Sequence, residues 1–223
     1  MKNIQLTSIA ALLIFGSISL LTNCKKDNVL PYKYEADVLN LPDQPFKYRD
    51  QMFTWTTRVT ELPSHMSHLQ VVLQSKVTDH GATLGRVLFY DPKLSLNNKT
   101  ACASCHLQEK GFADASRFSI GFDGGLTKRN ASSITNPADM RTFFWDARED
   151  NLKEMVLQPI KNHVEMGMDN FDALEKKLGL LDYYKPLFQN AFGDETITRD
   201  RIAEAMSQFL NSMVSANSPF DTA

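Results

Sequence analysis

Cys102-Ala103-Ser104-Cys105-His106 is a Cys-x-x-Cys-His pentapeptide, the motif through which c-type haem is attached to a polypeptide. Two thiols three residues apart on one helical turn can each form a thioether bond to a vinyl group of the haem. The histidine directly after Cys105 then turns its imidazole towards the iron from one face. A histidine ligand suits electron transfer and also peroxide or oxygen chemistry. The pentapeptide therefore predicts one covalently bound haem c.

Two other kinds of site also use closely spaced cysteines. A structural zinc site needs a second pair or further histidines at metal-ligand spacing, and none stands near Cys102 and Cys105. A thioredoxin-like redox pair is expected within a strand–helix–strand pattern, which the surrounding sequence lacks. Haem attachment is therefore the interpretation that the sequence favours.

Residues 1–23 have the features of a secretory signal. Lys2 gives a positive start, an uncharged and largely apolar run covers 9–21, and Leu-Thr-Asn-Cys follows at 21–24. The apolar run is shorter than the roughly 20 residues of a membrane-spanning helix. Its end resembles a bacterial lipoprotein signal in which Cys24 becomes the lipidated first residue, although Asn23 is larger than usual there. We expect a periplasmic lipoprotein anchored in a membrane; plain secretion or an uncleaved anchor are the alternatives.

The overall composition fits one globular domain with a small appendage. The chain has 223 residues, 43% of them hydrophobic, and a formal net charge of −2. That charge and the lack of a basic patch argue against a nucleic-acid partner. The only cysteines are Cys24, Cys102 and Cys105. If a lipid takes the first and haem takes the other two, none is left for a disulfide.

Residues 63–216, the expected haem domain, have the pattern of helices joined by long loops, after a tether and irregular segment at 24–62 that prolines interrupt. Apolar side chains at helical spacing predict four helices: from the cap Asp79 to the residue before Pro92, from Asn151 to Gln158, from about Asp169 to Gly179, and from Thr198 through Met213. Pro159 is expected to close the second of them. Sustained strand alternation is absent, so the sequence predicts an all-α domain.

Residues 92–150 show no sustained periodicity and predict long loops. A long irregular stretch in a compact domain usually has a function. A large planar cofactor packed against these loops would account for it.

From about Leu84 to Asp221 the chain resembles the N-terminal half of the bacterial di-haem cytochrome c peroxidases, which include the MauG-like proteins. Besides the haem motif, the resembling runs are LGRVLFYDP at 84–92, KRNA at 128–131, FWDAR at 144–148, VEMG at 164–167 and NSPFD at 217–221. The resemblance implies a cytochrome c-like domain with the peroxidatic haem, and a second haem domain that feeds it electrons. Residues 217–223 resemble the start of the linker to that second domain, so we expect the chain to be a fragment.

The same resemblance implies an oxidoreductase that reduces hydrogen peroxide to water, with electrons from a small c-type cytochrome or a cupredoxin. Glu165 matches a family glutamate over the distal face of the haem. A carboxylate there can take a proton from one peroxide oxygen and deliver it to the other. Without the resemblance, Glu165 would be interpreted as a solvated residue after a loop.

Phe122 departs from the family pattern. Many members have a histidine sixteen residues beyond the haem-binding histidine, where it caps the resting iron, and phenylalanine cannot ligate iron. We therefore expect an iron site that is open without reductive activation, unless the alignment slips in the Gly-rich loop at 119–125.

Met155 replaces a family glutamine, and it also fits the core face of its helix. His163 is expected at the rim of the distal side.

Trp145 and Asn130 match two further family positions. The resemblance places Trp145 between the two haems, where an indole can relay an electron; a buried aromatic beside Phe143 and Phe144 is the alternative. Asn130 corresponds to a calcium ligand at the domain junction, and calcium prefers oxygen ligands. Other calcium ligands would come from the second domain, so this chain alone is expected to bind calcium weakly.

The sequence leaves two other functions open. A non-enzymatic electron-transfer cytochrome would have a methionine as sixth iron ligand, and Met166 or Met168 is the candidate. Met206 and Met213 instead fit a helical core stripe. A MauG-like di-haem oxidase would modify a partner protein, and the open site expected from Phe122 is compatible with that role. The sequence does not decide between a monomer and a homodimer.

Overall fold

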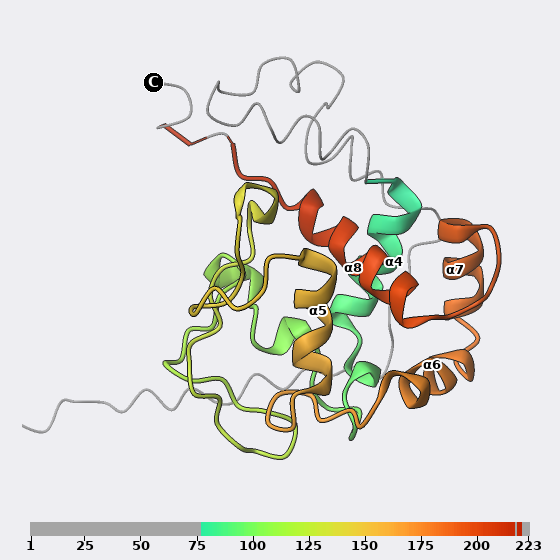
Figure 1. Ribbon diagram of the computed structural model, residues 1–223, viewed down its shortest axis with the longest axis horizontal. Helices are drawn as coiled ribbons and strands as arrows, with labels where there is room; N and C mark the ends of the chain where they lie inside the picture. Colours follow the sequence, from blue (N-terminus) through green and yellow to red (C-terminus); the bar gives the residue numbers. More distant parts are fainter. Residues whose placement is uncertain (1–76, 217, 220–223) are drawn as a thin grey trace, which may run out of the picture. The chain divides into compact units, whose positions relative to one another are not determined.

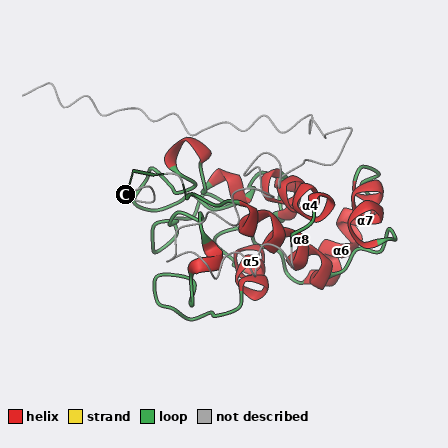
Figure 2. Cartoon of the chain, turned by 90° about the horizontal axis from the view of Figure 1, so that it is seen from above, coloured by secondary structure: helices red, strands yellow, loops and turns green. Residues whose placement is uncertain are grey.

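The computed structural model describes residues 77–216 and 218–219, all within the second of two units of the chain, residues 35–223. In chain order, the α-helices of this part are α4 (Asp79–Tyr90), α5 (Leu152–Lys161), α6 (Phe171–Gly179), α7 (Tyr184–Phe192) and α8 (Arg199–Ser212). These described residues contain isolated β-bridges and no strand. The predicted all-α fold is confirmed (Figures 1 and 2).

The predictions for the N-terminal part lie outside the described residues. They concern the signal at 1–23, lipidation of Cys24 and the tether at 24–62. Most of the expected linker start at 217–223 lies outside as well. Between residues 77 and 219, no described helix combines the length and apolarity that crossing a membrane requires.

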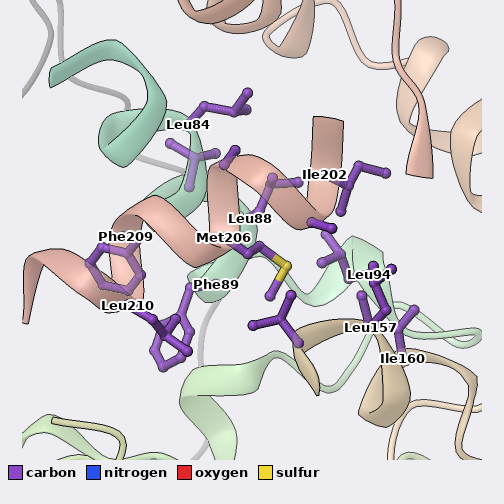
Figure 3. Close-up of a cluster of buried hydrophobic side chains, with 14 of the residues drawn as sticks. Leu84, Leu88, Phe89, Leu94, Leu157, Ile160, Ile202, Met206, Phe209 and Leu210 are labelled. Atoms are coloured by element: carbon purple, nitrogen blue, oxygen red, sulfur yellow. The ribbon is translucent and has the colours of Figure 1, made fainter. Parts of the chain in front are cut away.

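Helices α4 and α8 pack against each other at the centre of the domain (Figure 1). Each begins at a threonine cap, because the hydroxyl of Thr78 accepts from the N–H of Gly81 at 3.0 Å and that of Thr198 from the N–H of Arg201 at 3.3 Å. Figure 3 shows the buried side chains that surround this pair and the neighbouring helix α5: Leu84, Leu88, Phe89, Leu94, Leu157, Ile160, Ile202, Met206, Phe209 and Leu210. Met206 and Met213 are core residues, as predicted.

Gly85 sets the separation of α4 and α8. A Cβ atom at this position would lie 2.0 Å from the carbonyl oxygen of Ala205 and 2.6 Å from its carbonyl carbon. Both atoms belong to the backbone of α8, which cannot move aside without disturbing the helix. The close approach of the two helices therefore depends on the missing side chain.

Gly85→Ala is expected to lower the free energy of unfolding by about 1–3 kcal/mol, the usual cost of overpacking a core. The measurement is urea unfolding of the haem-loaded protein, read as a shift of the midpoint at unchanged slope. Gly179→Ala is the matched control, because no atom lies within 4 Å of its added Cβ. Alanine is the better helix former, so the control should be neutral or stabilising. Equal unfolding midpoints for the two variants would contradict the role of Gly85.

Helix α5 corrects one prediction. It starts after the cap Asn151 as expected, but it continues through Pro159 to Lys161. Pro159 stands in the last turn, where its missing N–H removes a single helical hydrogen bond. The N–H of Asn162 then closes the helix on the carbonyls of Gln158 and Pro159, at 3.1 and 3.2 Å.

Other helix bounds also differ from the prediction. Thr78, and not Asp79, caps α4, and Asn170 caps α6, one residue after the expected start. Helix α7 is not among the predicted helices, and Pro186 stands in its first turn, where an N–H has no helical partner to lose. The helices of residues 92–150 are short 3₁₀ helices: η3 (Pro92–Leu94), η4 (Cys102–Ser104), η5 (Gln108–Lys110) and η6 (Pro137–Asp139). The loop-rich prediction for this stretch is confirmed.

Candidate haem site

Cys102 and Cys105 lie on one tight turn. Residues Cys102–Ser104 form the 3₁₀ helix η4 instead of the expected α-helical turn, and the N–H of His106 donates to the carbonyl of Cys102 at 3.0 Å. Both thiols are free. Burial raises the pKa of Cys102 to about 12, with a further contribution from Cys105. Burial also raises the pKa of Cys105 to about 11, and Ser119 opposes part of this effect. Both cysteines therefore stay protonated near neutral pH, as thiols that can add to a vinyl group of the haem.

The ring of His106 is held in the tautomer that an iron ligand needs. Its Nδ1 lies 2.9 Å from the carbonyl oxygen of Phe112, which can only accept, so Nδ1 carries the proton. Burial lowers the pKa of His106, and the bond to Phe112 only partly opposes this effect. The ring is therefore neutral, and the lone pair of Nε2 is available to iron.

Phe112 reaches His106 because its backbone is left-handed. Its φ is 60°, directly after Gly111 at 65°, and a bridge between Leu107 and Ala113 closes the loop. A non-glycine residue in this region costs on the order of 1–3 kcal/mol. Sequence reasoning missed this residue, and only the glycine before it hinted at the turn.

These features fit haem c. Two unpaired thiols share one turn, and the adjacent histidine is neutral with a fixed orientation. Phe89 from α4 adds an apolar wall, with its ring centroid 6.4 Å from that of His106 and 6.3 Å from that of Phe112. Cys102 and Cys105 would hold the haem through thioether bonds, and His106 would bind its iron.

Glu165 lies close enough to the motif to act on both thiols. Its negative charge contributes to the raised pKa of Cys102 and to that of Cys105. Burial raises the pKa of Glu165 itself, and the positive charge of Arg148 partly opposes this shift. A carboxyl group whose pKa is shifted towards neutrality is suited to exchanging a proton with a substrate.

Asn162, the residue that ends α5, holds Glu165 in place. Its Nδ2 donates to Oε1 of Glu165 at 2.9 Å, and its Oδ1 accepts from the N–H groups of Val164 and Glu165 at 2.9 and 3.4 Å. One side chain thus closes the turn after the helix and orients the carboxylate. Met155, which replaces a family glutamine, packs against the core as expected. The signal that was overlooked is an Asn three residues before a candidate acid.

The loop of Phe122 packs directly against the loop of Glu165. The N–H of Phe122 donates to the carbonyl of Glu165 at 3.0 Å. Glycines make the close contact possible: a Cβ at Gly121 would lie 1.6 Å from the carbonyl oxygen of Val164, and one at Gly167 would lie 2.4 Å from the Phe122 ring. Phe122 therefore stands beside the candidate acid and offers no iron-binding atom.

A cavity of about 580 Å³ has Glu165 in its wall. Arg148, Lys161, His163 and Arg199 also line it, so basic side chains surround much of the approach. His163 is exposed. None of the three haem-motif residues lines the cavity, so it is the approach to Glu165 and not the space around the motif.

Trp145 and Asn130 are joined by a hydrogen bond of 2.8 Å from the indole Nε1 to the Asn130 carbonyl. Trp145 is 66% exposed, so the alternative of a buried aromatic is wrong. The Nδ2 of Asn130 donates to two backbone carbonyls, at 2.7 and 3.2 Å, which leaves its Oδ1 for another partner. Within the described residues, no group of three His, Cys, Asp or Glu side chains is placed to hold a metal ion.

Met166 and Met168 belong to the hydrophobic core, at 3% and 5% exposure. Either side chain would have to leave the core to ligate the iron. This placement argues against an electron-transfer cytochrome in which Met166 or Met168 is the sixth iron ligand.

Comparison with known proteins gives consistent matches. The family model for di-haem cytochrome c peroxidase matches residues 79–223. Methylamine utilization protein MauG of Methylophilus methylotrophus is 34% identical over 149 residues, which are 67% of this chain and 44% of that protein. Cytochrome c551 peroxidase of Nitrosomonas europaea is 36% identical over 140 residues, 63% of this chain and 42% of that protein. The crystal structure of a MauG-like protein associated with microbial copper homeostasis matches with a TM-score of 0.62 at 33% identity, over 66% of this chain and 44% of that one.

The matched region contains the haem motif, the Phe122 loop, Glu165 and helix α8. The chain spans about two fifths of the length of the curated relatives it matches. Because the family model covers well over half of this sequence, the chain belongs to the di-haem cytochrome c peroxidase family.

Proposed function

We propose that this chain provides the peroxide-reducing haem domain of a cytochrome c peroxidase, which converts hydrogen peroxide to water with electrons from a small c-type cytochrome or a cupredoxin. The observation that carries the proposal is the placement of Glu165, which Asn162 orients, which lies beside the Phe122 loop and which lines the cavity. Relatives that bear the name cytochrome c peroxidase, at 30–36% identity, support it.

Different residues of the chain have different roles in this reaction. When bound, the haem supplies an iron that peroxide can reach and that exchanges electrons. His106 would hold the iron through Nε2, because Phe112 engages its Nδ1. Glu165 takes a proton from one peroxide oxygen and returns it to the other, so that water is the leaving group. Asn162 keeps the carboxylate oriented during both transfers.

We further propose that the sixth position of the iron is open in the resting protein. The support is the placement of Phe122 beside Glu165 and of Met166 and Met168 in the core. The test is the optical spectrum of the purified ferric haem protein, before and after one equivalent of hydrogen peroxide. We expect a high-spin resting spectrum that changes on addition of peroxide.

Phe122→His is the informative variant for this test, because it restores the ligand that many family members have. It is expected to convert the resting spectrum to low-spin and to slow the reaction with peroxide. A wild-type spectrum that is low-spin and ignores peroxide would mean that the sixth position is filled, and the electron-transfer role would replace the enzymatic one.

A MauG-like oxidase that acts on a partner protein is the second candidate. The similarity to MauG favours it, and Trp145, which the resemblance places between the two haems, is the residue that would relay an electron. Trp145→Phe separates the candidates. It should abolish oxidation of a protein partner in the second case and leave the direct reaction with peroxide unchanged in both.

We propose that the protein resides in the periplasm and is anchored by lipid at Cys24. The support is the signal-like sequence of residues 1–24 and the haem motif itself. Metabolic labelling with a fatty acid should mark the wild-type protein and not Cys24→Ser, which should appear in the soluble periplasmic fraction.

We propose Asn130 as one calcium ligand. The bonds of its Nδ2 to two carbonyls orient its Oδ1 away from them, and its own carbonyl receives the indole of Trp145. Calcium would take carbonyls and waters as further ligands. Calcium titration of wild type and Asn130→Ala, followed by Trp145 fluorescence, should show a weak response that the variant lacks.

A further inference from the structure

Asp91, at the end of α4, accepts two phenolic hydrogen bonds on one oxygen. The hydroxyl groups of Tyr183 and Tyr184 both donate to its Oδ2 at 2.7 Å. Its Oδ1 accepts a hydrogen bond from the N–H of Lys93 at 2.8 Å. Through this bond Asp91 caps the 3₁₀ helix η3. Asp91 is only 1% exposed, and the peroxide reaction described above uses none of these residues.

The two tyrosines lead from the buried core towards the surface, and α7, which Tyr184 begins, packs against α4, as does η4 of the haem motif. Their ring centroids lie 4.7 Å apart, and their planes are tilted by 39°. Tyr184 is fully buried, whereas Tyr183 is half-buried. At the inner end, Cys102 is close enough to contribute to the raised pKa of Tyr184, after the larger effects of burial and of Asp91. Cys102 carries one of the two thioether bonds in the proposed haem site.

Oxidation of a buried tyrosine requires a nearby proton acceptor, and Asp91 is placed to be one. A phenol loses an electron readily only if its proton leaves at the same time, because the protonated radical cation is strongly acidic. Burial raises the pKa of both tyrosines, so neither ionises in advance near neutral pH. The carboxylate of Asp91, at hydrogen-bond distance from both hydroxyls, is the proton acceptor. One shared oxygen can serve each phenol in turn.

We propose that Tyr183, Tyr184 and Asp91 form a redox site that carries oxidising equivalents from the peroxide-oxidised haem to the surface; the inference rests on the proposed function. Tyr184 gives one electron to the oxidised haem, and its phenolic proton moves to Oδ2 of Asp91. The products are a neutral tyrosyl radical and a carboxylic acid. Tyr183 then reduces Tyr184 while Asp91 returns the proton to Tyr184 and accepts the one from Tyr183. A one-electron reductant at the surface, such as a reduced cytochrome, restores Tyr183 as Asp91 releases its proton to it.

The experiment mixes the haem-loaded protein with one equivalent of hydrogen peroxide, freezes it rapidly and records the electron paramagnetic resonance spectrum. Wild type should show a tyrosyl radical, and Tyr184→Phe should lose it. Asp91→Asn keeps a hydrogen-bond acceptor but cannot take a proton, so it should lose the signal too. Tyr183→Phe should keep a radical at Tyr184 that reduced cytochrome removes more slowly.

Tyr90→Phe is the matched control. The ring centroid of Tyr90 lies 5.1 Å from that of Phe89, which in turn lies 6.4 Å from that of His106. Its hydroxyl, however, donates to the amide oxygen of Gln108 at 3.3 Å and not to a carboxylate. This variant should leave the radical signal unchanged. Equal haem content and an unchanged ferric spectrum establish that each variant is folded.

The outcomes separate this inference from the proposed function. If the haem reacts with peroxide and the radical persists in Tyr184→Phe and Asp91→Asn, the inference is overturned and the function stands. If the haem ignores peroxide, the function fails, and the tyrosine site is tested with a photogenerated ruthenium(III) oxidant in the same protein. A radical that depends on Tyr184 and Asp91 then supports the redox site, and its absence overturns it.

Discussion

Glu165→Gln should lower kcat/KM for hydrogen peroxide by about 10²–10⁴-fold, the usual contribution of a general acid–base group. The amide preserves the size of the side chain and an acceptor for Asn162, but it cannot carry the proton between the peroxide oxygens. The measurement is stopped-flow consumption of peroxide with reduced donor in excess. The ferric haem spectrum should stay that of the wild type.

Glu154→Gln is the matched control for this prediction. Glu154 also lines the cavity, but its carboxylate is paired with Arg199. Its replacement should leave the rate close to that of the wild type. If both variants retain wild-type rates, Glu165 has a structural role only, and the proton would have to be carried by another group.

The pH dependence of the same reaction tests the assignment independently. The carboxylate form of Glu165 accepts the first proton, and burial raises its pKa. The rate should therefore fall as the pH falls through that raised pKa, above the ordinary glutamate value of about 4.3. Arg148→Gln removes the opposing positive charge, so this acid limb should move to higher pH. A limb that stays in place in Arg148→Gln, or persists in Glu165→Gln, would assign it to a different group.

Replacing both Cys102 and Cys105 by alanine is expected to abolish covalent haem attachment and, with it, peroxide reduction. Both thioether bonds are lost, and only His106 would hold the cofactor. After denaturing electrophoresis, wild type should retain haem staining and the double variant should retain none. Each single variant should keep one thioether bond and a shifted pyridine haemochrome band.

Ser104→Ala provides the control within the same turn. The hydroxyl of Ser104 accepts from the N–H of Ala101 at 3.0 Å, so its loss perturbs η4 without removing a thiol. This variant should keep its covalent haem. Haem that resists extraction from the double cysteine variant would show that the attachment runs through other residues.

The sequence predicted those parts of the fold that depend on periodicity. Helices α4 and α8 were found because their apolar residues recur at helical spacing and a threonine or aspartate precedes them. The end of α5 was misplaced because a proline in the last turn costs little once Asn162 closes the helix. Helix α7 is not among the predicted helices; it is only nine residues long, and Pro186 stands in its first turn. Local patterns do not show what a neighbouring segment supplies.

The residues of the candidate site were likewise predicted only in part. Cys102, Cys105 and His106 follow from their spacing alone, whereas the role of Glu165 followed only from the family resemblance. Asn162 and Phe112 were missed because each acts through a contact that exists only after the chain has turned back on itself. The roles assigned to Glu165, Trp145 and Asn130 stay predictions until the variants above are measured.

The pairing of α4 with α8 has a consequence for biosynthesis. The N–H of Thr78 donates to Oε1 of Gln208 at 2.9 Å, a bond between residues 130 positions apart. Contacts of such separation form late, because the entropy of a long loop must first be lost. During the export proposed above, residues 102–106 reach the periplasm before α8 does, so the core cannot yet close over them. The emerging chain therefore exposes both thiols during an interval in which burial does not yet shield them, and that interval is when an attachment enzyme in the periplasm has free access.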